Sequence, residues 1–262
     1  MPFVSASAIS PYNSIRGGAS ASASILDFAP FNVWDSEHLI VTGNTITFED
    51  FNNVGSKYNL VNPAATNKPD LLASDSEFNG LPSLSFDGVA EYVVGIASNY
   101  RSSDTTGAFI SVMRKTAGGS TRLNPFLTTQ SGGNKYIGYS IIGTGGTFQF
   151  TVNPSSSYSF KGNTNINDSN AFSIANINTG TSYKQYVNDT AQTVTPAAGN
   201  DGSLWINDAG GSINTLGVGA LVRGGNPSNF AKMDWVFSGY FPYTSDAQIE
   251  GIMTFLINKY GL

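Results

Sequence analysis

The stretch Thr147-Phe148-Gln149-Phe150-Thr151-Val152 alternates strictly between polar and apolar side chains. Successive side chains of a β-strand point to opposite faces, so this period of two places Phe148, Phe150 and Val152 together on one face. A strand with one apolar and one polar face is typical of an antiparallel sheet that is packed on one side. The stretch therefore predicts a half-buried strand of a β-sandwich.

Similar segments recur along most of the chain, with turn signals about every 8–12 residues, which is typical of all-β sandwiches. The predicted strands are Thr45–Phe51, Lys57–Val61, Leu84–Asp87, Tyr92–Ile96, Ala108–Arg114, Tyr136–Ile142, Thr147–Val152, Ala171–Ile177, Ser182–Val187, Leu204–Ile206, Leu216–Val222 and Lys232–Tyr240. In the last of these, the alternation places Met233, Trp235 and Phe237 on one face. Glycine pairs mark hairpin loops, where a positive φ is needed, at 118–119, 132–133, 145–146, 210–211 and 224–225.

One α-helix is predicted at the C-terminal end, over residues 245–260. Ser245 and Gln248 form a capping-box pattern, and Gly261 stands where a helix commonly ends. The apolar residues at helical spacing are Ile249, Ile252, Met253, Leu256 and Tyr260. This apolar stripe predicts that the helix packs against the sandwich.

Composition narrows the classes of function. The 262 residues include no cysteine, carry a net charge of −5 and are only 12% charged, against a usual ~25%. The absence of cysteine excludes disulfides, thiolate nucleophiles and cysteine-ligated metals. Because no basic cluster is present, binding to nucleic acid is not expected. No apolar run approaches the ~18–20 residues of a membrane span, so membrane insertion is not expected either.

Residues 1–26 differ in composition from the rest, with a small polar start and an alternating Ala/Ser tract at 19–24. Such a segment has too few large apolar residues to form its own core. It does contain spaced apolar anchors and a lone cation, namely Phe3, Ile9, Tyr12, Ile15 and Arg16. We expect an extended arm that docks on a partner or a neighbouring subunit, ahead of a folded domain at 27–262; a flexible tail is the alternative.

The first residues, Met1-Pro2-Phe3-Val4-Ser5, lack the cationic and apolar regions of a secretory signal peptide. The sequence as written therefore predicts a protein that stays in the cell that makes it until lysis or a dedicated export step.

Five segments, in order, resemble laminin-G-like domains of the concanavalin A-like class. They are Trp34-Asp35 through Phe51 to Tyr58-Asn59-Leu60, then Asn67-Lys68-Pro69-Asp70, then Leu81-Pro82-Ser83-Leu84-Ser85-Phe86-Asp87-Gly88 with Glu91-Tyr92, then Tyr186-Val187-Asn188-Asp189, and finally Gln248-Ile249-Glu250-Gly251 to Lys259-Tyr260-Gly261-Leu262. The resemblance covers about residues 31–262. It implies an all-β, antiparallel two-sheet jelly-roll sandwich with one C-terminal α-helix.

Domains of this kind occur in bacterial surface proteins, glycan-binding modules and bacteriophage virion proteins. A Ser-rich arm containing Ile9-Ser10-Pro11-Tyr12-Asn13-Ser14-Ile15-Arg16-Gly17-Gly18 looks most like phage structural proteins. The resemblance implies a non-enzymatic virion component, made in the host cytoplasm, of the tail fibre, spike or capsid decoration type. Such a component is anchored through its arm to other virion proteins, is expected to be a homo-oligomer, and displays a lectin-like domain for host attachment, through a cell-surface glycan, or for particle stabilisation. The alternative is a free-standing carbohydrate-binding module or bacterial adhesin.

Sugar binding needs an aromatic platform beside amide or carboxylate groups, because one face of the sugar stacks while its hydroxyls form hydrogen bonds. Three clusters offer this combination: Trp205 with Asn207 and Asp208; Asn134 with Tyr136; and Tyr100 with Arg101 and Asp104. The alternative for Trp205 is a place in the sandwich core, which is also expected of Trp34 and Trp235.

No catalytic residue is predicted. His38 is the only histidine, no G-x-S-x-G elbow accompanies it, and it fits a turn or packing role. The acid pairs Asp35/Glu37, Asp75/Glu77 and Glu49/Asp50 lie in expected loops or on opposite strand faces, which does not suit glycoside hydrolysis. No cofactor is predicted, although calcium stays open at the oxygen-rich stretches Asn165-Ile166-Asn167-Asp168 and Asn207-Asp208; loop residues of these types more often cap turns.

Overall fold

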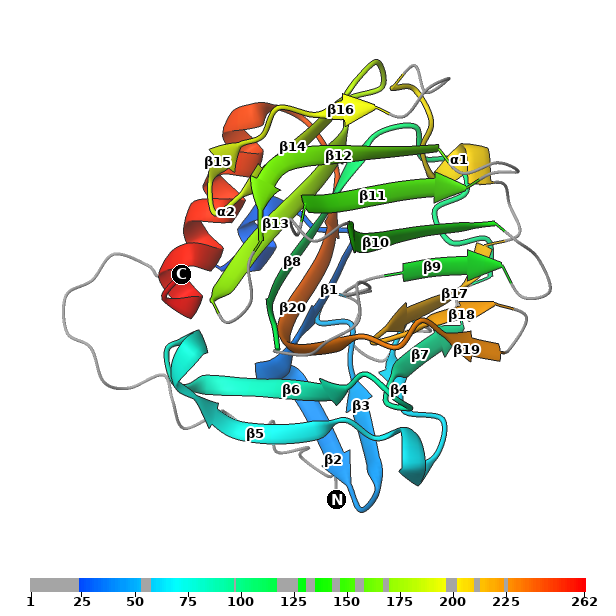
Figure 1. Cartoon of the computed structure of the whole chain (residues 1–262), viewed down its shortest axis with the longest axis vertical. Helices are drawn as coiled ribbons and strands as arrows, with labels where there is room; N and C mark the ends of the chain where they lie inside the picture. The colour runs from blue at the N-terminus through cyan, green and yellow to red at the C-terminus, as the bar shows by residue number, and fades with distance from the viewer. Residues whose placement is uncertain are drawn as a thin grey trace, which may run out of the picture.

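The chain folds into two stacked antiparallel sheets with one long helix on the outside (Figure 1). The computed structural model describes residues 24–52, 58–96, 98–116, 127–130, 135–142, 147–153, 158–166, 170–196, 202–209, 213–223 and 226–262. The predicted all-β sandwich with a C-terminal helix is confirmed. Among the described helices, none combines the length and apolar character needed to cross a bilayer.

Within the described residues, sheet A has eight strands in the order β15-β14-β13-β8-β20-β6-β5, with β1 paired to β20. Its strands are β1 (Asn32–Asp35), β5 (Asp70–Asp75), β6 (Leu81–Asp87), β8 (Gly107–Lys115), β13 (Ala171–Asn178), β14 (Tyr183–Val187), β15 (Thr190–Ala191) and β20 (Lys232–Phe241). The long central strands β8 and β20 carry the sheet, because each of them pairs along most of its length.

Sheet B has ten strands in the part of the chain that the structure describes, in the order β16-β12-β11-β10-β9-β17-β7-β4-β3-β2. Its strands are β2 (Leu39–Thr42), β3 (Thr45–Phe48), β4 (Leu60–Val61), β7 (Val93–Ile96), β9 (Leu127–Gln130), β10 (Tyr136–Ile142), β11 (Thr147–Asn153), β12 (Tyr158–Asn165), β16 (Thr195–Pro196) and β17 (Ile213–Val218). A separate hairpin of β18 (Leu221–Arg223) and β19 (Asn226–Ser228) follows β17, and a short helix α1 (Ile206–Ala209) precedes it.

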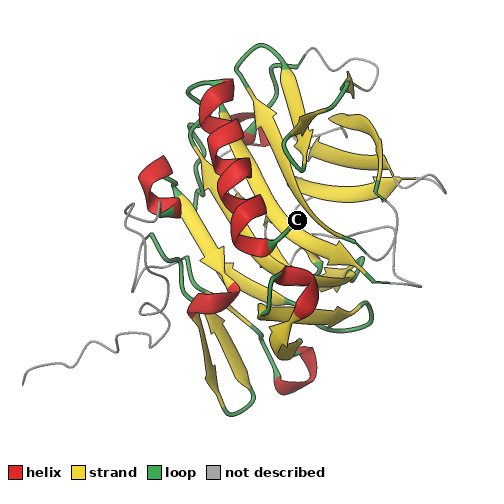
Figure 2. Cartoon of the chain, turned by 90° about the vertical axis from the view of Figure 1, so that its left-hand side faces the viewer, coloured by secondary structure: helices red, strands yellow, loops and turns green. Residues whose placement is uncertain are grey.

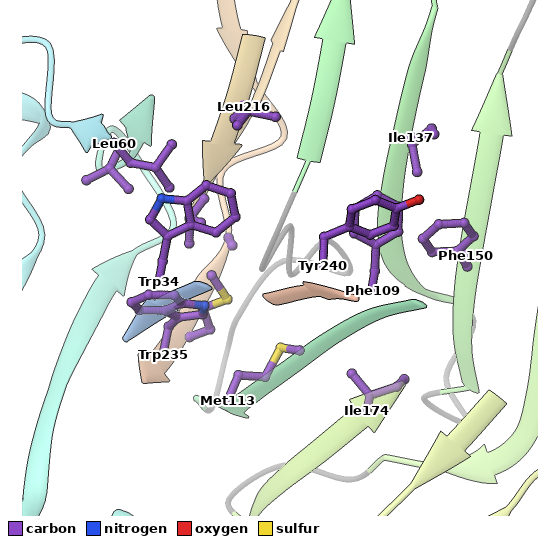
Figure 3. Packing of buried hydrophobic residues seen from close by; sticks show 14 of the residues in the cluster. Trp34, Leu60, Phe109, Met113, Ile137, Phe150, Ile174, Leu216, Trp235 and Tyr240 are labelled. Atoms are coloured by element: carbon purple, nitrogen blue, oxygen red, sulfur yellow. The ribbon is translucent and has the colours of Figure 1, made fainter. Parts of the chain in front are cut away.

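The main core lies between the two sheets (Figure 3). Phe109 of β8 packs against Tyr240 of β20 with ring centroids 4.6 Å apart, and against Phe150 of β11 at 5.8 Å. Trp34 and Trp235 are fully buried here, as the sequence predicted. Phe150 and Val152 also share this face, which confirms the alternation of that strand for the part whose side chains are described.

Helix α2 (Asp246–Tyr260) covers the outer face of sheet A (Figure 2). The Ser245 side chain accepts a hydrogen bond from the Gln248 N–H, and Gly261 adopts the left-handed conformation, so both predicted caps are confirmed. All five predicted apolar residues of the helix are buried against this sheet. The side chains opposite them on β8 are Ala108, Ile110 and Val112.

One predicted face on β20 is wrong. A register shift between Trp235 and Phe237 inserts Val236 as an extra residue against β8. Met233 and Trp235 point into the inter-sheet core as expected, but the bulge turns Phe237 to the opposite face, under α2. A β-bulge of this kind depends on the partner strand rather than on the alternation of its own residues.

Two other elements differ from the sequence prediction. Leu204–Ile206 is not a strand, because Leu204 and Trp205 belong to the loop that enters α1. Leu216–Val222 is interrupted by a turn at Gly219, whose φ is +91° and where a side chain would collide with the ring of Phe86. The chain therefore leaves sheet B at this point and starts the hairpin β18–β19.

The folded body begins before residue 27. Ile25 lies in a capped 3-10 helix (Ile25–Phe28) and is buried in the cluster under α2. The ring of Phe28 meets Phe255 of α2 edge-on, at 6.2 Å between centroids. Residues 24–26, which the sequence assigns to the arm, are therefore part of the domain. The anchors Phe3 to Arg16 lie outside the described residues.

A buried ion pair ties the end of α2 to sheet A. The ammonium of Lys259 lies 2.6 Å from Asp35 Oδ2 and 2.6 Å from Glu37 Oε2, and the Tyr260 hydroxyl donates to the same Asp35 oxygen. Asp35 is almost completely buried, so its charge depends on these partners. Removing the cation from such a site leaves an uncompensated buried carboxylate, which is strongly destabilising.

We expect Lys259→Met to lower the free energy of unfolding by about 3 kcal/mol, because it leaves Asp35 buried and unpaired. The matched control is Lys184→Met, which removes an ion pair between β14 and Asp246 on the same helix. That pair is more exposed, so its loss should cost less than about 1 kcal/mol. Urea unfolding followed by tryptophan fluorescence measures both, and equal losses would contradict the buried role of Lys259.

Candidate functional site

The outer face of sheet B contrasts with that of sheet A, because α2 packs only on the latter. On β7, Val93 points into the core, whereas Val94 and Ile96 alternate outward, and 76% of Ile96 is exposed. Ile96 pairs directly with Thr215 of β17, which places both on the outer face. This face therefore presents isolated apolar side chains beside hydroxyl and amide groups.

The pairing of β17, β9 and β10 shows which residue of β10 lies on the same outer face as Ile96 and Thr215. Thr215 pairs with Thr129 of β9, and Thr129 pairs with Tyr136 of β10. Ile137, the next residue, is buried in the core, so Tyr136 points outward and is half-buried. Tyr136 is thus a predicted site residue that shares its face with Ile96. Its predicted companion Asn134 lies outside the described residues.

A hollow of about 330 Å³ opens on this face, over β7 and β17. Its lining residues are Pro63, Tyr92, Val94, Ile96, Asn214, Thr215 and Val222. Val222 comes from β18, because the turn at Gly219 brings the hairpin back beside the sheet. Tyr92 packs with Val222, Ala220 and Phe230 in a small cluster that supports one side of the hollow.

Gly95 lets the floor of this region pack closely. A Cβ at this position would collide with the backbone oxygen of Asn59, which leads into β4, the strand paired with β7. The glycine lies between Val94 and Ile96, so this close approach fixes the strand that carries both of these lining residues. A glycine inside a strand often marks such a backbone contact.

Two titratable residues just before β7, Glu91 and Tyr92, have shifted pKa values. Burial raises the pKa of Tyr92, so its hydroxyl stays protonated and can donate a hydrogen bond. Partial burial raises the pKa of Glu91 to about 7, and the negative charges of Asp87 and Asp70 act in the same direction. The hydrogen bond that Glu91 accepts from the Asp87 N–H lowers this pKa, but its effect is smaller than that of burial. Asp87 itself caps the turn by accepting from the Val89 and Ala90 N–H groups.

The clusters around Trp205 and Tyr100, which are distant in sequence, form one cluster in space. The loop at 98–106 lies against α1, where the Asn207 N–H donates to the Asp104 backbone oxygen at 3.1 Å. Asp208 accepts from the Trp205 N–H at 2.9 Å and so caps the turn that enters α1. The sequence analysis treated these residues as two separate sugar-binding clusters and did not predict that they meet.

Neither aromatic ring of this cluster is a sugar platform. Trp205 and Tyr100 are both buried in the inter-sheet core. The Trp205 indole N–H donates to the Tyr240 hydroxyl at 3.0 Å, and the Tyr100 hydroxyl donates to Asn32 at 2.7 Å. The prediction that these two rings stack on a ligand is therefore wrong, because stacking requires an open face. For Trp205, the alternative place in the core is confirmed.

Arg101 and Asp104 have a local structural role. The Arg101 Nε lies 2.6 Å from Asp104 Oδ2, and its guanidinium covers the ring of Phe31 at 3.5 Å from the centroid. The ion pair holds a turn in which Arg101 has a left-handed φ of +48°. Because the open face of Phe31 is already occupied by a cation, this cluster offers no free aromatic surface to a sugar.

The other candidates for chemistry are engaged in holding elements together. Lys259 pairs with Asp35 and Glu37, and Arg114 lies between Asp75, Glu77 and Asp234. Buried Asp50 accepts from the Asn32 amide at 2.6 Å and from the Val33 N–H at 3.0 Å. His38 lies in an exposed turn, with its ring 3.9 Å from that of Phe51, which confirms the packing role expected of it.

The calcium question concerns the two oxygen-rich stretches. Within the part of the chain that the structure describes, no three His, Cys, Asp or Glu residues lie together in a way that could hold a metal. At the second stretch, the Asp208 carboxylate is used as a turn cap, while the Asn207 side-chain oxygen is buried without a partner among the described residues. In the first, residues 167–169 lie outside the described residues, so the calcium alternative stays open there.

No protein-family model matches this chain, and no curated protein sequence matches it. Solved structures do share its fold. The CBM40 domain of the IT-sialidase from Ruminococcus gnavus aligns with a TM-score of 0.50 and 10% identity, over 65% of this chain and 97% of that domain. The NanB sialidase from Streptococcus pneumoniae aligns with a TM-score of 0.50 and 12% identity, over 64% of this chain and 26% of the sialidase.

A leech intramolecular trans-sialidase aligns similarly, with a TM-score of 0.50 and 11% identity, over 65% of this chain and 27% of the enzyme. This chain therefore spans about a quarter of the length of the two sialidases. The likeness to the carbohydrate-binding domain covers nearly that whole domain, so the fold is a jelly-roll-like sandwich of the same general type.

The pKa of Glu91 predicts a specific pH dependence of stability. A folded-state pKa of about 7, above the ordinary 4.5, means that folding favours the protonated carboxyl. This stabilisation is fully present below pH 4.5 and is lost as the pH rises through 7. Between pH 5 and pH 8, the free energy of unfolding of the wild-type protein should fall by about 1 kcal/mol more than that of Glu91→Gln. This value is smaller than the full pKa shift implies, because Glu91 is partly exposed and solvent screens its interactions.

Urea unfolding at the two pH values measures this difference. The control is Glu250→Gln, which neutralises an exposed acid on α2 and should track the wild-type protein at both pH values. If Glu91→Gln also tracks the wild-type protein, the carboxyl does not carry the raised pKa.

Proposed function

We propose that this chain is a non-catalytic carbohydrate-binding protein whose ligand lies on the outer face of sheet B. The observation that carries the proposal is the open hollow over β7 and β17, on a face that helix α2 does not cover. Small-molecule sites are typically concave and mostly apolar, with a few placed polar groups. The hollow has this composition, with Val94 and Ile96 beside Asn214 and Thr215.

The wider composition of the face supports the same function. Tyr136 adds an outward, half-buried aromatic ring, and Gln149 on β11 adds an amide that donates a hydrogen bond to the buried hydroxyl of Thr151 at 3.2 Å. Hydroxyl and amide groups match the neutral hydroxyls of sugars. The similar CBM40 domain is a carbohydrate-binding domain of a sialidase, and at 10% identity its likeness supports the fold only. The proposal therefore rests on the face itself.

The proposal predicts which residues a glycan needs. On a glycan array, the full chain should bind at least one glycan, and Ile96→Ser should weaken that binding about tenfold, because a large apolar contact is lost. The matched control is Ile40→Ser, the same change at a residue 47% exposed on β2, at the far edge of the same sheet. Both isoleucines are exposed, so neither variant should unfold the protein.

Solution titration of the best array ligand against the wild-type protein and both variants provides the quantitative measurement. Equal weakening by the two variants would place the ligand elsewhere on the protein. Absence of binding to every glycan on the array would contradict a carbohydrate-binding function.

The virion role stays a prediction from the sequence. In this role the chain would be the lectin-like domain of a fibre, spike or capsid decoration protein. The role depends on an anchoring arm whose predicted anchor residues lie outside the described residues. Host attachment would use the same glycan-binding face. Imaging of a particle that contains the chain tests the role, since the chain must be located on that particle with its first residues directed toward a neighbouring protein.

A further inference from the structure

The hollow on sheet B has two chemically different walls. Val94, Ile96 and Val222 form an aliphatic wall contributed by β7 and β18. Asn214 and Thr215 of β17 form a polar wall, in which the threonine hydroxyl donates to the asparagine side-chain oxygen at 3.2 Å. An aliphatic wall favours a methyl group, whereas a primary amide and a hydroxyl favour a group that both donates and accepts hydrogen bonds.

Charge selects a neutral ligand. None of the lining residues carries a charge. An anionic group placed in the hollow would therefore find no cation in its lining to pair with.

Size limits the ligand to about one sugar residue. A volume of about 330 Å³ is at the lower end of the range of about 300–1,000 Å³ for small-molecule pockets. Further sugar units would extend across the open sheet face, toward Tyr136 on β10.

We propose that the hollow binds the acetamido group of a neutral N-acetylhexosamine residue. The methyl group packs against Val94, Ile96 and Val222, and the amide hydrogen-bonds at Asn214 and Thr215. This inference rests on the proposed carbohydrate-binding function and names the class of sugar recognised at the same site. Neither wall alone selects this sugar, since a plain hexose has no methyl group and a 6-deoxyhexose has no amide.

The test uses pairs of glycans that differ only in the acetamido group. Chitotriose and cellotriose form one pair, and β-linked N-acetylgalactosamine and galactose glycosides form another. We expect the full chain to bind the N-acetylated member of at least one pair at least tenfold more tightly, because a site built to hydrogen-bond a group discriminates against its absence. In saturation-transfer NMR, the acetyl methyl protons should receive the largest signal.

Two variants connect this preference to the hollow. Ile96→Ser should reduce affinity for the N-acetylated glycan at least fourfold, since burying one methyl group contributes about that factor, whereas Ile40→Ser should not. Asn214→Asp keeps the size of the side chain and the acceptor for Thr215, but removes the amide donor and adds a negative charge. It should reduce the same affinity at least tenfold while leaving the thermal unfolding midpoint within a few degrees.

The outcomes separate this inference from the function on which it rests. Equal affinity for both members of every pair, or preference for a sialylated glycan, would overturn the acetamido proposal while leaving carbohydrate binding intact. Binding of the N-acetylated sugar that is unaffected by Ile96→Ser and Asn214→Asp would also overturn it. Failure to bind any glycan on the array would instead overturn the proposed function.

Discussion

The structure depends on one constraint, which is that sheet A has apolar side chains on both faces. On β8, Phe109 and Met113 face sheet B, while Ala108, Ile110 and Val112 face the opposite way. Burial of this second set requires another layer, because exposed apolar surface forgoes roughly 25 cal/mol per Å² of stabilisation. Helix α2 supplies that layer. The ion pairs of Lys259 with Asp35 and Glu37 hold the last turn of the helix against the end of β1. The asymmetry of the whole domain follows from this docking.

The asymmetry separates the face that stabilises the fold from the face proposed to bind a ligand. The helix occupies one side of the sandwich, and the hollow opens on the other, so side chains such as Ile96 can stay exposed without being required for the core. Much of the small set of charges is used structurally: Arg114 and Lys259 each satisfy acids near sheet A. Around the hollow, the outer face of sheet B carries hydroxyl and amide groups, whereas exposed Lys161, which pairs with Gln149, adds a charge farther along the same face.

Local patterns in the sequence were sufficient for the elements that depend on local interactions. The alternation of Thr147–Val152 and the caps at Ser245 and Gly261 concern contacts within a few residues, and the structure agrees with them where it describes them. The bulge that turns Phe237 could not be predicted in this way, because it arises from the match between β20 and β8. Trp205 was misleading for a related reason. Its polar neighbours in sequence suggested a surface, whereas the residues that bury it, such as Phe109 and Phe150, come from distant strands.

The hollow is the clearest case of a site that no single segment indicates. Ile96, Thr215 and Val222 become neighbours only through the pairing of β7 with β17 and the return of the hairpin at Gly219. Each residue alone is unremarkable in its strand, and Ile96 in particular matches the alternation of an ordinary half-buried strand. Its meaning comes from a face that the rest of the fold leaves uncovered. The hollow brings this isoleucine together with an amide and a hydroxyl, and a ligand with a methyl group next to an amide would contact all three side chains at once.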